Sequence, residues 1–325
     1  MIDKIKNVEK QLQDKKVAIA FSGGADSTLI AYIAKKVTKD HLAITINNSI
    51  MPTDFINDSK EIADYLNINQ VVIKDDFYDY SEFLENKSNK CYLCRKRMYE
   101  HITKVAKDNG FNTVIDGTNI SDLLDNRPGI LINYKNNIVS PFVNAKLESF
   151  EIHNYLRENN IPYLKASTCL GTRIEVNKPI NKDNIKIIQK SEDFIKSNTN
   201  AEIVKVRKKD KTAICELDNI DDIINKRTLI VDYLKSLGFK KIYLNLSEIE
   251  EDNPIKLDYI GNDFNYQLPY NINLNATFNV LKENNISLNN LKLFENGEIK
   301  GENFKNENEA KEEFINILPV IRRNL

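Results

Sequence analysis

The chain has 325 residues, a length that favours at least two domains. Its 46 Lys and Arg nearly balance its 47 Asp and Glu, so the net charge is −1 and no overall basic field exists to collect nucleic acid. No apolar run approaches the length of a membrane span, and the N-terminus lacks the hydrophobic stretch of a signal peptide, which predicts a cytoplasmic protein without membrane contact.

Apolar strands and amphipathic helices alternate in the N-terminal third of the chain. Strands are predicted at residues 17–21, 41–46, 70–73 and 113–115. Helices are predicted at residues 1–14, 27–36, 54–66 and 92–109. The first strand is apolar without alternation, which indicates burial on both faces, as in a parallel sheet. Repeated βα units of this length predict an α/β fold, with a doubly wound parallel sheet and helices on both faces.

A turn of one Ser and two Gly joins the first strand to the next helix. This geometry binds phosphate, because backbone N–H groups converge at the helix N-terminus and the helix dipole adds positive charge. Gly23 and Gly24 let an anion approach the backbone, while Ser22 and Ser27 add hydroxyl donors. Asp26 can hold Mg²⁺ or position a nucleotide.

An ordinary βα turn with a Ser or Asp cap would explain a bare Gly-Gly pair, but not the whole string Ser-Gly-Gly-Ala-Asp-Ser over residues 22–27. The string resembles the signature of the PP-loop ATP pyrophosphatases, which cleave ATP between the α and β phosphates. Ligands in such sheets lie beyond the carboxyl ends of the strands. We therefore expect Asn47, Asn48 and residues 116–119, which follow two other strands, to join residues 22–27 in a nucleotide pocket.

Residues 116–129 are dense in turn formers and charges. Asp122 and Asp125 lie one turn apart, and Arg127 can bind an anion. A short capped helix that ends before Pro128, without any binding role, explains the same pattern.

Cys91 and Cys94 stand at the start of the helix predicted at residues 92–109. The positive end of the helix and the basic residues 95–97 both favour thiolates, and these flanking charges argue against burial. The spacing is compatible with zinc, a redox pair or an iron–sulfur cluster, or with two helical cysteines that carry no chemistry. Cys169 lies in a polar loop of small residues, whereas Cys215 lies in a strand pattern and is interpreted as packing.

Beyond the first domain, helices are predicted at residues 182–196 and 226–237, and strands at residues 202–208, 212–217 and 241–246. The lysines at residues 208, 209 and 211 are interpreted as a solvated hairpin. Further on, Asn296-Gly297 predicts a hairpin turn, and Asn306 with Glu309 predicts a helix cap. We divide the chain into an α/β domain at 1–177, a smaller α+β domain at 178–246 and an extension of unreadable role at 247–325.

Several of these segments, in order, resemble the LarE family of ATP-dependent sulfur transferases, which act in nickel-pincer cofactor biosynthesis. Beside the glycine turn, the most specific segments are Gly117-Thr118-Asn119 and residues 169–174, Cys-Leu-Gly-Thr-Arg-Ile. The similarity ends near residue 246. The nucleotide-binding residues implied by the resemblance are Ser22, Gly23, Gly24, Asp26, Ser27, Ile46, Gly117, Asn119, Asp122 and Arg127. The implied catalytic residues are Asp26, Cys169, Arg173, Glu192 and Arg207.

In that family some members give up the sulfur of one cysteine, and others look like holders of a [4Fe–4S] cluster on three cysteines. This chain has all three positions, Cys91, Cys94 and Cys169, so the resemblance favours the cluster, with zinc as the rival. An open fourth iron would hold an extra sulfide. Residues 175–177, Glu-Val-Asn, depart from the family pattern near the substrate pocket, which leaves the identity of the acceptor less secure.

The resemblance implies an enzyme that adenylates a carboxylate with ATP and Mg²⁺ and replaces AMP with sulfur to give a thiocarboxylate. The implied substrate is a pyridinium dicarboxylate mononucleotide, with sulfide or a sulfur donor as partner and a homo-oligomer as one form of assembly. A PP-loop enzyme that thiolates tRNA also combines this loop with three cysteines, but the balanced charge argues against it. An amide ligase that uses ammonia and a non-enzymatic nucleotide sensor are also compatible with the glycine turn, and neither needs the cysteines.

Overall fold

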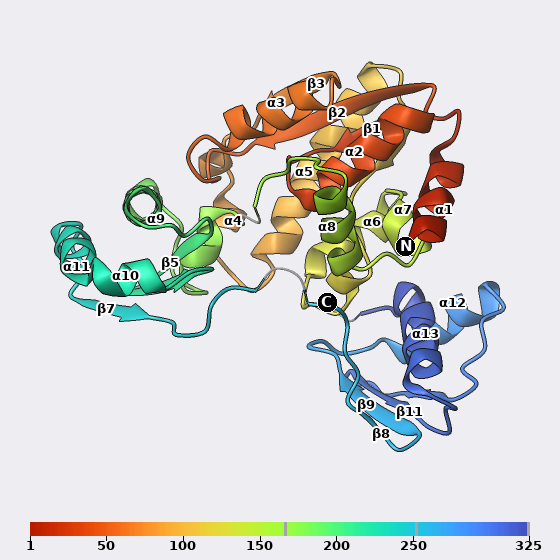
Figure 1. Cartoon of the computed structure of the whole chain (residues 1–325). Coiled ribbons are helices and arrows are strands. Elements are labelled where there is room, and N and C mark those ends of the chain that lie inside the picture. The colour runs from red at the N-terminus through yellow and green to blue at the C-terminus, as the bar shows by residue number, and fades with distance from the viewer. Residues whose placement is uncertain (166–167, 251–252, 324–325) are drawn as a thin grey trace.

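A four-stranded parallel sheet forms the centre of the N-terminal part of the molecule (Figure 1). The structure, a computed structural model, describes residues 1–165, 168–250 and 253–323. The strand order is β3-β2-β1-β4. The strands are β1 (Lys16–Ala20), β2 (Asp40–Asn47), β3 (Gln70–Lys74) and β4 (Thr113–Ile115). All four confirm the predicted strands to within one residue at each end, and their parallel pairing confirms the predicted fold class.

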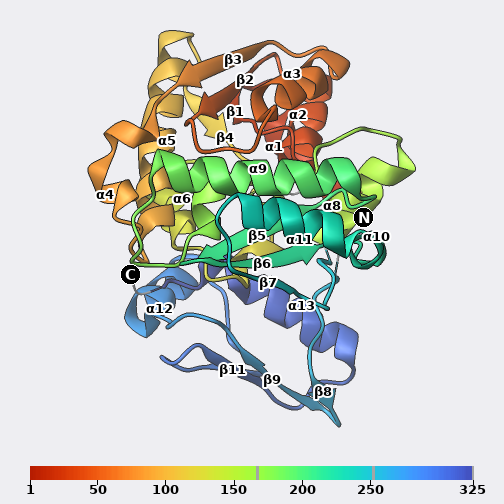
Figure 2. The same cartoon turned by 90° about the vertical axis from the view of Figure 1, so that its left-hand side faces the viewer.

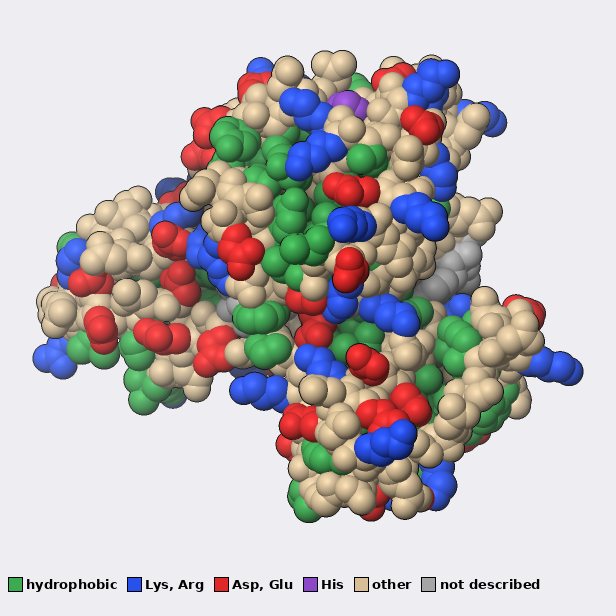
Figure 3. All heavy atoms as spheres, turned by 45° about the vertical axis from the view of Figure 1, so that its right-hand side comes forward, with side chains coloured by type: hydrophobic (Ala, Val, Ile, Leu, Met, Phe, Trp, Pro, Cys, Tyr) green, Lys and Arg blue, Asp and Glu red, His purple; other side chains and the backbone are tan. Residues whose placement is uncertain are grey.

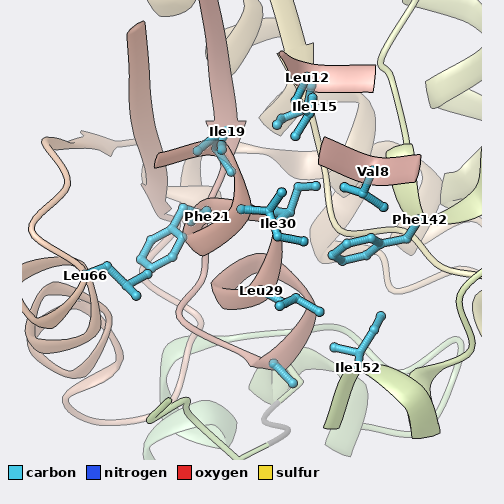
Figure 4. Close-up of a cluster of buried hydrophobic side chains, with 14 of the residues drawn as sticks. Val8, Leu12, Ile19, Phe21, Leu29, Ile30, Leu66, Ile115, Phe142 and Ile152 are labelled. Atoms are coloured by element: carbon cyan, nitrogen blue, oxygen red, sulfur yellow. The ribbon is translucent and has the colours of Figure 1, made fainter. Parts of the chain in front are cut away.

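Helices cover both faces of this sheet, as the alternation predicts. On one face lie α1 (Ile2–Leu12), α2 (Ala25–Val37), α3 (Phe55–Tyr65) and α8 (Ser149–Glu158). On the other face lie α5 (Lys90–Asp108) and α6 (Leu131–Lys135). Figure 4 shows the first of these cores, in which Leu29 and Ile30 of α2 lie among Ile19, Val8 and Phe142. Each such side chain stabilises the fold by about 1.5–3 kcal/mol when fully buried.

Two short helices complete this part of the chain, α4 (Ser81–Leu84) and α7 (Pro141–Asn144). Phe83 of α4 packs with Ile50, Leu170 and Ile185 in an apolar cluster that joins the loops of the first sheet to the second sheet's main helix. This cluster also fixes the surroundings of two cysteines.

A second sheet of three strands has the order β5-β6-β7. Its strands are β5 (Val204–Lys209), β6 (Thr212–Leu217) and β7 (Lys241–Leu244), with β5 antiparallel and β7 parallel to β6. The helices are α9 (Lys182–Asn198), α10 (Asp221–Asn225) and α11 (Arg227–Ser236), of which α10 is absent from the sequence prediction. Cys215 lies in their shared core with 1% of its surface exposed, as a packing residue should.

A third, antiparallel sheet lies in the C-terminal extension, beneath the second sheet in Figure 2. Its strands, in the order β10-β11-β9-β8, are β8 (Tyr259–Ile260), β9 (Asp263–Gln267), β10 (Leu291–Leu293) and β11 (Glu298–Gly301). Its helices are α12 (Leu274–Glu283) and α13 (Glu307–Ile317). The predicted hairpin is confirmed, with Gly297 at a φ of +89°. The Asn306 side chain caps α13 by accepting from the Glu309 N–H at 3.0 Å.

Within the described ranges, none of the helices is both long and apolar enough to cross a membrane. Basic and acidic side chains are interspersed over the face shown in Figure 3. That distribution agrees with the balanced net charge of the whole chain.

Candidate functional site

A cavity of about 370 Å³ opens where β1 and β4 end, at the predicted edge of the sheet. The predicted nucleotide-binding residues that line it are Ser22, Gly24, Asp26, Ser27, Gly117, Asp122 and Arg127. Asn119 bonds Asp26 from beside it, and Gly23 lies within the turn. The Ile46 side chain instead packs in the core on the sheet face that α5 and α6 cover. Contact of that residue with a nucleotide stays a prediction. Asn47 and Asn48 bond their own turn, at Ser49 and Ile50.

The glycine turn is held open by its own hydrogen bonds. Ser22 N–H donates to Ser27 Oγ at 3.2 Å, and that hydroxyl donates to the Gly24 carbonyl at 3.0 Å. Gly23 has a φ of +78°, and a Cβ there would meet Leu164 Cδ1 at 2.9 Å, so a side chain is excluded by conformation and by space. Gly24 then serves as the N-cap of α2, whose free N–H groups face the cavity mouth.

Gly117 packs directly against the glycine turn's helix. A Cβ on Gly117 would lie 2.7 Å from the backbone carbon of Asp26, closer than real Cβ contacts. The glycine therefore allows the loop after β4 to touch the first turn of α2, and this contact brings the two halves of the cavity together.

Asp26 is half-buried in the wall of the cavity, where Asn119 Nδ2 donates to its Oδ1 at 2.9 Å. Burial, and next the negative charge of Asp122, raise the pKa of Asp26 to about 8, while Arg127 opposes the shift. A cation that binds next to a carboxyl with a raised pKa lowers that pKa and favours the ionised form. The arrangement therefore suits a group that faces magnesium-bound phosphates.

The carboxylate of Asp116 is held by several hydrogen bonds from neighbouring side chains. Its carboxylate accepts from Arg95 Nη2 at 2.5 Å, from the Tyr99 hydroxyl at 2.7 Å and from Ser140 Oγ at 2.7 Å. Burial alone would raise the pKa of Asp116, but Arg95 and these hydroxyls hold it below its usual range. Arg95 and Tyr99 also line the cavity, and the sequence pattern assigns neither to it.

Asp122 and Arg127 face the cavity from the segment that follows β4. Arg127 Nη1 donates to Asp122 Oδ1, and Arg127 Nε lies 3.2 Å from Asp125 Oδ2. The Asn119 N–H donates to Asp122 Oδ2 at 3.0 Å. Arg127 therefore pairs with both acids of this segment, and its predicted contact with an anion stays a prediction.

Cys91 and Cys94 lie in the first turns of α5, and Cys169 immediately precedes the short helix at Leu170–Arg173. Cys94 and Cys169 pack against the same apolar cluster, beside Phe83. Burial first, and then the nearby Cys169 and Cys91, raise the pKa of the Cys94 thiol, and burial likewise raises the pKa of Cys169. Cys91 is exposed and Cys94 half-buried. The prediction of a favoured thiolate is wrong for Cys94, because desolvation raises the pKa of its thiol by more than the neighbouring Arg95 lowers it.

Cys169 and Cys91 lie near enough to Cys94 to raise the pKa of its thiol, and Cys91 acts on Cys169 in the same direction. Even so, residues 1–165, 168–250 and 253–323 contain no group of three His, Cys, Asp or Glu side chains arranged to hold a metal ion. Thr168, the residue before Cys169, lines the nucleotide cavity. The cysteine-bearing turn thus borders the cavity, while Ser167 falls outside the described residues.

Lys90 ties the two cysteine segments together, and no sequence motif points to it. Its Nζ donates to Asn86 Oδ1 at 2.5 Å and to the Gly171 carbonyl at 2.9 Å, and 7% of the residue is exposed. Asn86 Nδ2 in turn donates to the Glu175 and Lys178 carbonyls, both at 2.8 Å. The start of α5 and the loop before it are therefore bonded to the helix that follows Cys169 and to the chain just after that helix.

Arg173 and Glu192 form a buried ion pair, with Arg173 Nε 2.7 Å from Glu192 Oε1. The same Oε1 accepts from the Val206 N–H at 2.8 Å, so the pair joins the Cys169 turn to β5. Burial raises the pKa of Glu192, and Arg173 opposes that shift. Both residues border a second cavity of about 440 Å³, which shares Leu164 and Lys165 with the first.

Arg207 lies on the outer surface of the second sheet. Its Nε donates to Glu216 at 2.7 Å and its Nη1 to the Thr172 carbonyl at 3.2 Å. His153 of α8, assigned from the sequence only to a helix face, lines the nucleotide cavity and packs edge-on to Tyr163. A single histidine on an amphipathic helix gives no sequence signal of such a place.

Comparisons with known proteins show what the chain is similar to. Residues 1–137 match the family model of the PP-loop domain. An uncharacterized protein of Methanocaldococcus jannaschii is 34% identical over 241 residues, which cover 74% of this chain and 93% of that protein. The pyridinium-3,5-bisthiocarboxylic acid mononucleotide synthase of Lactiplantibacillus plantarum is 27% identical over 243 residues, 73% of this chain and 87% of the synthase. A subunit of the glutamine-hydrolyzing GMP synthase of Methanococcus vannielii is 28% identical over 130 residues, 38% of this chain and 41% of that subunit.

Proposed function

Since the chain belongs to the PP-loop family and is a homologue of pyridinium-3,5-bisthiocarboxylic acid mononucleotide synthase, we propose that it activates a carboxylate with ATP and replaces AMP with sulfur. The observation that carries the proposal is the border between the cysteine-bearing turn and the nucleotide cavity, at Thr168 and Cys169. In this proposal a sulfur atom held at that border attacks the acyl carbon of the adenylated carboxylate, and the bond between that carbon and the AMP oxygen breaks.

ATP occupies the first cavity in this proposal. The backbone N–H groups at Gly23 and Gly24, with the hydroxyls of Ser22 and Ser27, bind the phosphates, and Asp26 faces their Mg²⁺. Arg127 offsets charge on the departing pyrophosphate. Adenylation makes AMP the leaving group, and AMP departs far more readily than the oxygen of a free carboxylate.

The acceptor occupies the second cavity, which adjoins the first at Leu164 and Lys165. By analogy with the synthase of Lactiplantibacillus plantarum, we propose a pyridinium-3,5-biscarboxylic acid mononucleotide as substrate. Lys165 and Lys196 supply positive charge for its carboxylate or phosphate. The Arg173–Glu192 ion pair stabilises one wall of this second cavity. Arg207 is proposed as a further substrate cation at the outer edge, next to the Thr172 carbonyl.

For the sulfur step, we propose that Cys91, Cys94 and Cys169 hold a [4Fe–4S] cluster. The support is chemical: three cysteines supply the thiolates that such a cluster needs, and Cys169 and Cys91 lie near enough to Cys94 to raise the pKa of its thiol, which would ionise when bound to iron. When bound, the cluster would supply an open iron site for an extra sulfide. Zinc on the same thiols is the alternative.

Anaerobic purification with iron, sulfide and zinc analysis tests this site. Wild-type protein is expected to contain iron and sulfide with cluster-type absorbance, and Cys169→Ala is expected to lose most of both. Cys215→Ala is the matched control, because Cys215 lies in the core of the second sheet and should leave the metal content unchanged. Zinc in place of iron, or equal iron in the Cys169→Ala variant, would reject the cluster.

A further inference from the structure

The C-terminal extension packs against the segment that forms one wall of the nucleotide cavity (Figure 1). Ile120 and Leu123 of that segment are buried in one apolar core with the extension's residues. The members contributed by the extension include Leu268, Ile272, Phe314, Leu318 and Ile321. The extension therefore shares its own core with the loop that carries Asp122.

Two polar side chains of the extension bond the backbone of this loop. The Tyr270 hydroxyl donates to the Leu123 carbonyl at 2.6 Å. Arg323 donates from Nη2 to the same carbonyl at 2.9 Å and from Nη1 to the Asp125 carbonyl at 2.8 Å. Its guanidinium lies 3.7 Å from the centre of the Tyr270 ring, so the two side chains brace each other.

These carbonyls belong to the end of a short helix, Ser121–Leu123, and to the turn after it. Carbonyls at a helix end have no partner within the helix, so donors from elsewhere decide how firmly the turn is held. Asp122 and Arg127, which flank the bonded stretch, face the cavity from the opposite side. A shift of the turn would therefore move both side chains, together with the Asp122 charge that acts on Asp26.

We propose that Tyr270 and Arg323 are positioning residues for the nucleotide site, and that the extension sets ATP affinity through Asp122 and Arg127. The inference rests on the ATP-binding part of the proposed function and on no part of the sulfur chemistry. The inference gives a role to residues 253–323. The alignment with the methanogen protein spans 241 residues, which are too few to cover all three sheets of this chain.

The test compares Tyr270→Phe and Arg323→Gln with Tyr259→Phe in the full-length protein. Tyr259 is the matched control, because its hydroxyl donates to the Phe304 carbonyl inside the extension, at 3.4 Å. Three quantities are measured: hydrogen exchange of the amides of residues 119–127, the dissociation constant for Mg·ATP by calorimetry, and the melting temperature. Tyr270→Phe and Arg323→Gln should each weaken ATP binding about fivefold to tenfold and speed exchange in this loop similarly. Tyr259→Phe should change neither by more than about twofold.

Unchanged exchange in residues 119–127 for both test variants would overturn the inference, whatever their melting temperatures. Faster exchange with unchanged ATP affinity would also overturn it, because the loop would then move without consequence for the site. If wild-type protein binds no ATP, the proposed function fails, and the exchange data still decide whether Tyr270 and Arg323 hold the loop. A Tyr259→Phe variant that behaves like Tyr270→Phe would reduce the effect to general loss of stability and reject the positioning role.

Discussion

At the scale of single residues, Asp26 links the site to the stability of the fold. Its pKa is raised to about 8 by burial and by Asp122, whereas an unfolded Asp titrates near 4. Between those pH values the folded state binds more protons at this position than the unfolded state. The free energy of unfolding therefore falls as pH rises from about 4 to about 8 and is constant, for this group, above that range.

Asp26→Asn removes this titration and should stabilise the ligand-free protein increasingly as pH rises. We expect the gain over wild type to grow by about 2–4 kcal/mol between pH 5 and pH 8 and to level off above pH 8. Urea unfolding at several pH values measures it, and the same variant should bind Mg·ATP more weakly. A difference from wild type that does not change with pH would contradict the proposed state of Asp26.

Residue identity alone could not reveal how the charges near the cysteines are used. Arg95 follows Cys94 in sequence, but its guanidinium bonds Asp116, and Arg97 bonds Asp75 from the same helix. Cys94 is covered by Phe83 and by the Cys169 turn, and no local sequence pattern predicts these long-range contacts. By contrast, the glycine turn was predictable, because its role requires only strand, turn and helix in immediate succession.

At the scale of elements, the junction between α5 and the Cys169 turn depends on Lys90. Its ammonium satisfies the Gly171 carbonyl and the Asn86 amide oxygen in a buried setting, where unpaired acceptors are costly. Removing the ammonium should therefore loosen the contact between the two cysteine segments more than it disturbs the nucleotide cavity, which Lys90 does not line.

Lys90→Met should destabilise the protein by about 1–3 kcal/mol in urea unfolding and lower the iron content of anaerobically purified protein. Lys87→Met is the matched control, because Lys87 is exposed and pairs with Glu85 on the surface. It should leave both the stability and the iron content near those of the wild type. Iron retention at the wild-type level in Lys90→Met, despite lost stability, would show that Lys90 does not order the cysteines.

Elements with strong local signals were predicted well. The buried strand β1 has an uninterrupted apolar run, the run of β2 is broken only by Thr45, and the hairpin of β10 and β11 has its Asn-Gly turn. The helix α10 is only Asp221–Asn225 and carries little periodicity, so it escaped prediction. The contact between the extension and residues 120–125 joins segments far apart in sequence, which single-sequence patterns do not encode.

At the scale of the whole molecule, the two adjoining cavities lie between the loops of the first sheet and the α9–β5 side of the second, and the third sheet lines neither. The charge is balanced over the sequence, and basic and acidic side chains are mixed on the face shown in Figure 3. The family relationship and the cavity geometry together support adenylation. The proposed role of the cysteines is what separates sulfur transfer from amide formation, which does not need them.

The most direct test of this account is mass spectrometry of the reaction product. Anaerobically reconstituted protein is incubated with ATP, Mg²⁺, pyridinium-3,5-biscarboxylic acid mononucleotide and sulfide. The account predicts a thiocarboxylate product, in which sulfur has replaced a carboxylate oxygen, with AMP and pyrophosphate formed in equal amounts. ADP and phosphate as products, or AMP release that yields an amide or an unchanged carboxylate while the nucleotide is consumed, would contradict it.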